Sequence, residues 1–221
     1  MTLPPPEFVW WPRKGYGFMA PAKRFDYDRA YFDRCAMQEQ TDVGLNLAEL
    51  RMQFVRRNRR PPLSICDVGV GAGLFTSLMQ CSGFDVNPHA IQMLQKVGRW
   101  ADLTRTNIHD TLCFWDSFEH IMSPEILVRQ AARNVYISLP VFKSSEHAFG
   151  SKHFKPDEHL WYFTERGLLG WMGEQGFALV ERNNDEERYG REGIGSFHFQ
   201  RVDQADGGAV AGRGPELPPA S

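Results

Sequence analysis

The sequence predicts an α/β fold in which a doubly wound, mostly parallel sheet carries helices on both faces. Three apolar, strand-like segments, 63–68, 111–115 and 134–140, alternate with segments of helical character. A glycine-rich turn, 69–73, joins the first of these strands to the helix that follows it. Alternation of this kind favours a parallel sheet, because each helix returns the chain to the edge at which the previous strand began.

Length and composition indicate one globular domain. The chain has 221 residues, of which 42% are hydrophobic and 24% are charged. A net charge of −2 argues against a nucleic-acid partner held by bulk electrostatics. We expect no signal peptide and no membrane span. The four cysteines form no CxxC pair and are interpreted as reduced core residues of a cytoplasmic protein: Cys35, Cys66, Cys81 and Cys113.

Two flanking segments differ from the domain, which we expect over 26–202. Residues 1–25 are rich in proline and aromatic side chains, which predicts an extended arm. Trp10, Trp11 and Phe18 are unfavourable in water, so the arm is expected to pack on the domain or on a second subunit of a homodimer. Residues 203–221 lack large apolar side chains and are predicted to be disordered.

Within the domain the predicted elements follow one another closely. Residues 27–60 have a helical pattern that Pro61 and Pro62 end, and Pro88 opens a helix that runs to about residue 97. Ser123 begins another helix, and Thr164 caps one that Gly176 ends. Further predicted segments are a loop over 141–163, paired strands at 177–181 and 195–202, and a weak third strand at 100–103.

The glycine loop over 67–73 has the chemistry of a ligand site. Glycine allows the backbone to approach a ligand, and a following helix offers free N–H groups to an anion. The spacing Gly69-x-Gly71-x-Gly73 is followed by Leu74, where a dinucleotide fingerprint would place its third glycine, and the loop has no lysine of a phosphate-binding P-loop. This spacing disfavours a nicotinamide dehydrogenase.

Asp85 stands at the expected end of the second strand, after a glycine and a short apolar stretch. A carboxylate at this position can accept hydrogen bonds from both hydroxyls of a ribose. A buried core would avoid aspartate here unless the side chain had polar partners.

Four segments in order resemble the class I methyltransferases, which use S-adenosylmethionine (SAM). Segment 65–73 resembles their SAM-binding loop, and 83–88 looks like their ribose-binding strand end. Segment 112–121 resembles the fourth strand of the subgroup that includes the ubiquinone-biosynthesis O-methyltransferases. Segments 159–164 and 176–177 are similar to the segments before and after the last helix of that subgroup. The resemblance implies a Rossmann-like sheet of the seven-stranded type with an antiparallel last strand. The unit after the glycine loop is shorter than is usual in this family.

The resemblance also implies roles for individual residues. The glycine loop would line the methionine part of SAM, Asp67 would face its amino group, and Asp85 would hold the ribose. Asn87 and Asp102 would lie near the adenine. The full cofactor set is Asp67, Gly69, Val70, Gly71, Gly73, Asp85, Val86, Asn87, Asp102, Trp115 and Asp116. The substrate-binding set is Glu119, His120, Trp161 and Tyr162.

Two groups of titratable side chains have more than one interpretation. The segment 116–120 could form a metal or acid/base cluster, but Glu119 and His120 could instead orient the loop. We favour the second interpretation and assign no metal, because one histidine and two carboxylates in one turn are an incomplete metal site. His147, His153 and His159 recur every six residues, and one of them is a candidate general base.

The function expected from these observations is SAM-dependent methyl transfer to an oxygen or nitrogen of a small-molecule acceptor. The basic run over 56–60 precedes the first strand, at the edge of the sheet opposite the ligand edge, which disfavours a nucleic-acid substrate. A nucleic-acid methyltransferase therefore stays a lesser alternative. A non-catalytic scaffold that keeps the fold is a second alternative, suggested by the short unit after the glycine loop.

Overall fold

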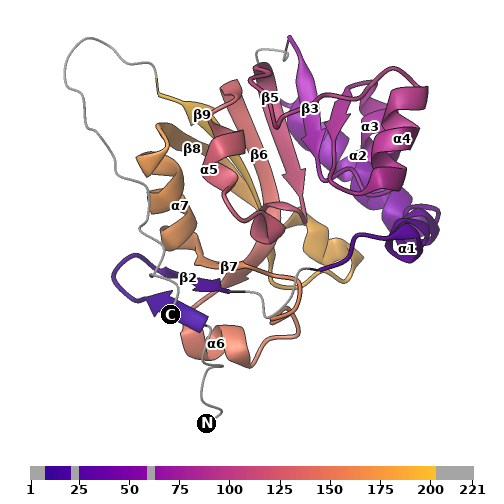
Figure 1. Ribbon diagram of the computed structural model, residues 1–221. Coiled ribbons are helices and arrows are strands. Elements are labelled where there is room, and N and C mark those ends of the chain that lie inside the picture. The colour runs from indigo at the N-terminus through magenta and orange to yellow at the C-terminus, as the bar shows by residue number, and fades with distance from the viewer. Residues whose placement is uncertain (1–7, 21–24, 59–62, 203–221) are drawn as a thin grey trace.

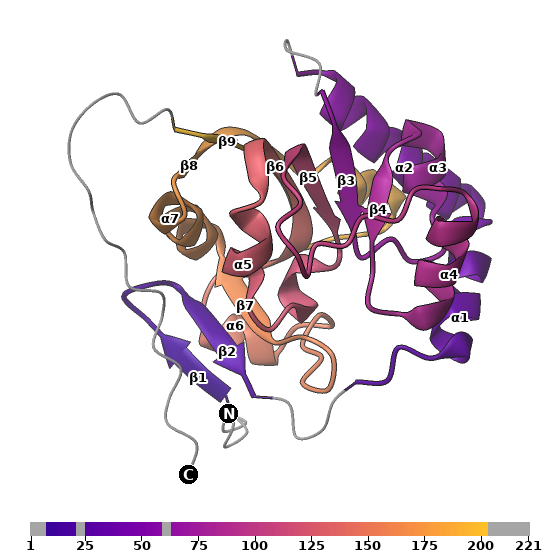
Figure 2. The ribbon, with the colours of Figure 1, turned by 45° about the horizontal axis from the view of Figure 1, so that its top comes forward.

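The computed structural model describes residues 8–20, 25–58 and 63–202. Its central sheet places four parallel strands side by side in the order β4, β3, β5, β6 (Figures 1 and 2). These strands are β3 (Ile65–Val68), β4 (Ser82–Phe84), β5 (His109–Trp115) and β6 (Ala131–Phe142). The predicted doubly wound, mostly parallel sheet is confirmed.

An antiparallel pair extends the sheet beyond β6. Strand β9 (Ile194–Arg201) runs antiparallel to β6 over seven residue pairs, and β8 (Phe177–Asn183) pairs with the other side of β9. The two strands correspond to the segments predicted at 177–181 and 195–202, and β9 is the expected antiparallel last strand.

Helices cover both faces of the sheet. Phe114 and Ile137 point to a core shared with α5 (Pro124–Val128) and α7 (Glu165–Glu174). The alternate residues Cys113 and Tyr136 pack against α2 (Asp42–Arg56) and α3 (Leu74–Met79) on the opposite face. Successive side chains of a strand point to opposite faces, so the near-continuous apolar sequence of β5 fits a sheet that is buried on both sides.

Residues 8–19 form a hairpin that adds to the sheet. Strands β1 (Phe8–Trp11) and β2 (Tyr16–Met19) pair with each other, and β2 pairs with β7 (Trp161–Thr164), which lies parallel to the end of β6. The predicted arm therefore packs on its own domain through backbone hydrogen bonds. The remainder of the arm and the predicted tail, 203–221, lie outside the described residues.

Several boundaries differ from the sequence-based expectations. The helix predicted over 27–60 is two helices, α1 (Arg29–Glu39) and α2, because the hydroxyl of Thr41 caps a new N-terminus by accepting from the Gly44 amide. The weak third strand is only an isolated bridge between Gly83 and Trp100. The predicted loop over 141–163 contains a short helix, α6 (Ser145–Phe149), and most of β7.

Other helical predictions are confirmed at their ends. Pro88 is the first residue of α4 (Pro88–Lys96), and Thr164 caps α7 by accepting from the Gly167 amide. Two 3-10 helices, η1 (Phe118–His120) and η2 (Asp185–Tyr189), complete the described elements. Within the described residues, none of the helices is long and apolar enough to cross a membrane.

Candidate functional site

A cavity of about 1040 Å³ opens at the carboxyl ends of β3, β4 and β5. Ligands of open α/β sheets bind at this edge, because the loops that follow neighbouring parallel strands converge there. Predicted site residues that line the cavity are Asp67, Gly69, Val70, Gly71, Asp85, Val86, Trp115, Asp116, His120 and His153.

The glycine loop has the backbone geometry that its sequence predicts. Gly69 has φ 79°, and a Cβ there would lie 2.5 Å from the Cβ of Ser117. Gly71 also has a positive φ and lines the cavity. Gly73 does not line the cavity, and a Cβ there would lie 2.7 Å from the Met93 side chain of α4. The first two glycines thus keep backbone open to a ligand, and the third allows close helix packing.

Asp67, at the floor of the cavity, is a buried carboxylate that is only half satisfied. Its Oδ2 accepts a hydrogen bond of 2.8 Å from the Thr76 hydroxyl, whereas Oδ1 is buried without a partner. Burial raises the pKa of Asp67 to about 7. A buried, unpartnered carboxylate oxygen beside a cavity is suited to a cationic or N–H-bearing ligand group.

Asp85 follows β4 and lines the neighbouring part of the cavity. Its Oδ1 accepts from the Asn87 amide at 2.8 Å, and burial raises its pKa. Because β3 and β4 are adjacent parallel strands, Asp67 and Asp85 meet the same cavity from neighbouring strand ends.

Two of the residues predicted near an adenine have other roles. Asn87 is buried, and its side chain caps α4 by accepting from the His89 amide while donating to the Asp28 carbonyl. Asp102 is absent from the cavity wall and accepts from the Thr104 amide at 3.0 Å. Neither side chain lines the cavity, so the structure places both outside the site to which the sequence assigned them.

Helix α1 covers the cavity from the side opposite the sheet, a role that the sequence interpretation missed. Tyr31, Cys35 and Glu39 are spaced four residues apart, so they share one helix face, and all three line the cavity. The Glu39 carboxylate accepts from the Ala72 and Leu74 amides at 2.8 and 2.9 Å. Helix α1 is thereby joined to the glycine loop, although it has no buried residue of its own.

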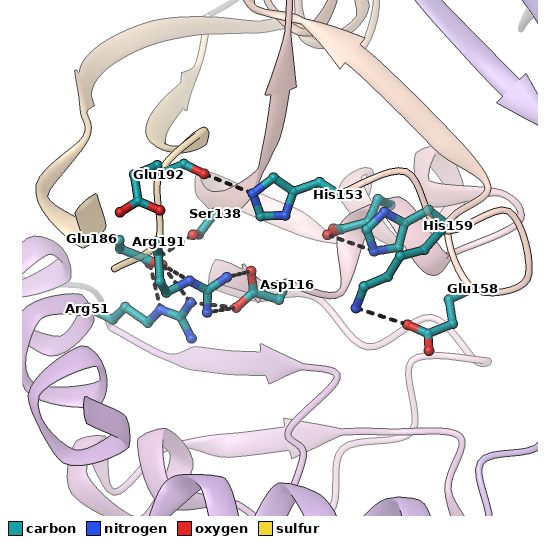
Figure 3. A network of polar contacts seen from close by, with 11 residues as sticks. Arg51, Asp116, Ser138, His153, Glu158, His159, Glu186, Arg191 and Glu192 are labelled. Atoms are coloured by element: carbon teal, nitrogen blue, oxygen red, sulfur yellow. Dashed lines mark hydrogen bonds and ion pairs between the residues drawn. The ribbon is translucent and has the colours of Figure 1, made fainter. Parts of the chain in front are cut away.

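An ion-pair network closes the end of the cavity near β5 (Figure 3). Arg51 of α2 donates to Asp116 at 2.6 Å and to Glu186 of η2 at 2.8 Å. Arg191 pairs with the same two carboxylates, and the Ser138 hydroxyl donates to Glu186. Although burial alone would raise it, the two guanidinium groups hold the pKa of Asp116 below its usual value.

This network fixes an unusual backbone. Asp116 has φ 54°, a left-handed conformation that is uncommon for residues other than glycine. The two arginines hold the side chain while the chain turns as it leaves β5, and Ser117 and His120 then line the cavity. Arg51, Glu186 and Arg191 were not predicted from the sequence.

The predicted substrate and base residues separate into three groups. His120 and His153 line the cavity. Trp161 and Tyr162 instead lie in β7, buried in the core, where the Trp161 indole donates to the Ile121 carbonyl, and this corrects their substrate-binding assignment. Residues off the cavity wall are the exposed His147 and the buried Glu119 and His159.

Solved structures with the same fold were found at low sequence identity. The magnesium protoporphyrin IX methyltransferase of Synechocystis PCC 6803 with bound SAH has a TM-score of 0.58, 16% identity, and coverage of 80% of this chain and 96% of that chain. The 1,6-didemethyltoxoflavin-N1-methyltransferase of Burkholderia thailandensis has a TM-score of 0.55, 14% identity, and coverage of 79% and 84%. The plantazolicin methyltransferase BpumL in complex with a triazolic desmethylPZN analog and SAH has a TM-score of 0.53, 14% identity, and coverage of 78% and 90%.

Comparison with curated protein sequences found no match. The family model described as a methyltransferase domain matches residues 37–182, a segment that extends from the end of α1 to the end of β8. This match contains the glycine loop, Asp85 and Asp116. Since it spans more than half of the chain, the protein belongs to the methyltransferase-domain family.

Proposed function

We propose that this protein binds SAM in the cavity and transfers its methyl group to an oxygen or nitrogen of a small-molecule acceptor. The observation that carries the proposal is the pair of acidic side chains, Asp67 and Asp85, that flank an open glycine loop in one cavity. The free oxygen of Asp67 suits the ammonium group of SAM. The carboxylate of Asp85 suits the ribose hydroxyls.

The part of the cavity beyond the glycine loop supports a small acceptor with an apolar face. Side chains from α1 and from the segment after β5 line this part, and the charged network lies on its other side. The apolar wall includes Phe25, Tyr27, Tyr31, Ile121, Met122 and Leu160. Structural neighbours that act on a porphyrin and on a toxoflavin precursor support the same class of acceptor, as does the resemblance of segment 112–121 to small-molecule O-methyltransferases.

The chemistry requires little beyond positioning, because SAM carries an activated methyl group. Bound SAM would supply the methyl group, and the walls of the cavity would hold an acceptor atom in line with it. A hydroxyl acceptor must also lose a proton. His153 is our candidate base, because its Nε2 contacts the Glu192 carbonyl at 2.8 Å. A carbonyl can only accept, so Nε2 donates this hydrogen bond, and in the neutral imidazole Nδ1 is the nitrogen that can take up a proton.

Isothermal titration calorimetry with SAM tests the cofactor assignment. The Asp85→Ala variant should bind SAM at least tenfold more weakly, because two hydrogen bonds to a charged group are lost. The matched control is Asp102→Ala, which removes an acidic side chain that does not line the cavity and should leave the affinity unchanged. Wild-type protein that does not bind SAM, or equal affinity in both variants, would refute the assignment.

A further inference from the structure

Three side chains with metal-ligating atoms meet beside the cavity, on two segments far apart in the sequence. Glu119 and His120 belong to η1, and His159 immediately precedes the Leu160–Trp161 step into β7. One potential ligand atom from each lies within 4.8 Å of the other two. The Nε2 atom of His159 is 4.0 Å from Oε1 of Glu119, and the two imidazole rings are nearly perpendicular at 4.7 Å.

Polar atoms in this cluster are buried without partners. Glu119 is 2% exposed and His159 is 4% exposed. The Oε2 atom of Glu119 and the Nδ1 atom of His159 have no hydrogen-bond partner. Leaving a buried polar atom unsatisfied is unfavourable by about 1–3 kcal/mol, so a bound group that contacted these atoms would stabilise the cluster.

The backbone holds the two segments in register. The Leu160 amide donates to the Glu119 carbonyl at 2.8 Å, and the Trp161 indole donates to the Ile121 carbonyl at 2.9 Å. The cluster therefore sits between two cross-linked segments and is supported by the core beneath it. A preorganised ligand set needs this kind of support.

The tautomer of His120 is fixed as in many metal-bound histidines. Its Nδ1 contacts the Glu158 carbonyl at 2.9 Å. Because a carbonyl only accepts, Nδ1 carries the proton and Nε2 keeps a lone pair. A ligating histidine commonly donates its other ring N–H to a backbone carbonyl in this way.

We propose that Glu119, His120 and His159 bind one divalent transition-metal ion of the zinc class. Two imidazoles and one carboxylate form a donor set that zinc uses when it keeps a position open to a further ligand. The sequence interpretation had judged the site incomplete, because it counted Asp116 and had no reason to include His159. The structure assigns Asp116 to two arginines and supplies His159 in its place.

The location suggests what the metal would do. His120 lines the cavity, whereas Glu119 and His159 lie behind it. An ion held by all three would therefore adjoin the space in which we place the acceptor. An oxygen of the acceptor could occupy its open position, which would restrict that acceptor to oxygen-bearing molecules. This role rests on the proposed function, whereas metal binding itself does not.

Metal binding can be measured without any acceptor. Tag-free, full-length protein is treated with a chelator, desalted and titrated with ZnCl2 by calorimetry, and with CoCl2 followed by visible absorption. We expect one saturable site per chain, with the visible bands of protein-bound cobalt. Glu119→Gln and His159→Gln should each weaken binding at least tenfold. The control His153→Gln changes a cavity-lining histidine outside the cluster and should bind as the wild type does.

The outcomes separate the two proposals. No saturable site, a site that both cluster variants retain, or a site that His153→Gln removes would each overturn the metal assignment. Thermal unfolding shows whether each variant is folded; if the buried substitutions unfold the protein, the partly exposed His120→Gln gives the same test. SAM titrations without metal are run on the same samples. A failure of SAM binding with intact metal binding counts against the proposed function alone.

Discussion

Replacing Asp67 by asparagine should stabilise the ligand-free protein at neutral and higher pH. The side chain is 2% exposed, one of its oxygens has no partner, and burial raises its pKa to about 7 from the usual 3.8. Each pKa unit corresponds to about 1.4 kcal/mol, so ionising Asp67 in the folded state is unfavourable by at most roughly 4 kcal/mol. Asparagine keeps the shape and can still accept from the Thr76 hydroxyl.

The sign follows from which state holds the proton more tightly. Between pH 4 and about 7 the folded protein keeps the Asp67 proton and the unfolded chain releases it. The wild-type free energy of unfolding should therefore fall as the pH rises through this range. The Asp67→Asn variant should lose less stability, because it lacks the contribution of the Asp67 carboxyl. The difference between the two proteins should be small at pH 4 and approach its maximum at pH 8.

Urea unfolding at pH 4.5, 6 and 8 measures this effect on stability. SAM titration of the same samples measures the effect of the substitution on SAM affinity. Because the variant cannot pair its side chain with an ammonium group, we expect it to bind SAM at least tenfold more weakly even though it is more stable. If the free energy of unfolding changed with pH in the same way for both proteins, Asp67 would ionise as easily in the folded state as in the unfolded chain. The argument from its burial would then be wrong.

Two further substitutions test the local geometry. Gly69→Ala should lower the free energy of unfolding by about 1–3 kcal/mol, because its φ is positive and the new Cβ would lie 2.5 Å from the Ser117 Cβ. Urea unfolding measures the change, and unaltered stability would contradict the geometry. Arg51→Met should lower it by about 1–3 kcal/mol, because Glu186, 1% exposed, loses one partner while Arg191 and Ser138 still contact it. Arg57→Met is the matched control at the C-cap of α2, where half-exposed ion pairs contribute less than about 1 kcal/mol.

The parts of the site that were predictable are contiguous in the sequence. The glycine loop and the Pro88 helix start combine residue types that have strong local conformational preferences. Their structures therefore follow from a few neighbouring residues. Asp85 was identified for a similar reason, since a carboxylate directly after an apolar strand needs a polar partner.

The parts that were missed depend on distant contacts. Arg51 lies 65 residues from Asp116 and 135 residues from Glu186, and no local pattern links these positions. Strand β7 is only four residues long, and its partner β2 lies near the other end of the chain. Asn87 shows the opposite failure. Its position fits a ligand contact, but its side chain instead caps α4 and donates to the Asp28 carbonyl.

The hairpin over 8–19 does not line the cavity, but it supports a strand whose neighbouring residues lie beside that cavity. The Met19 amide donates to the Leu160 carbonyl at 2.8 Å, one residue from His159. Without the hairpin, β7 would become a bare edge strand and the side chain of Tyr162 would lose its cover from Phe8. A change in this hairpin would thus reach the end of the cavity at which we propose the acceptor through the backbone hydrogen bonds, so the hairpin supports that end from a distance.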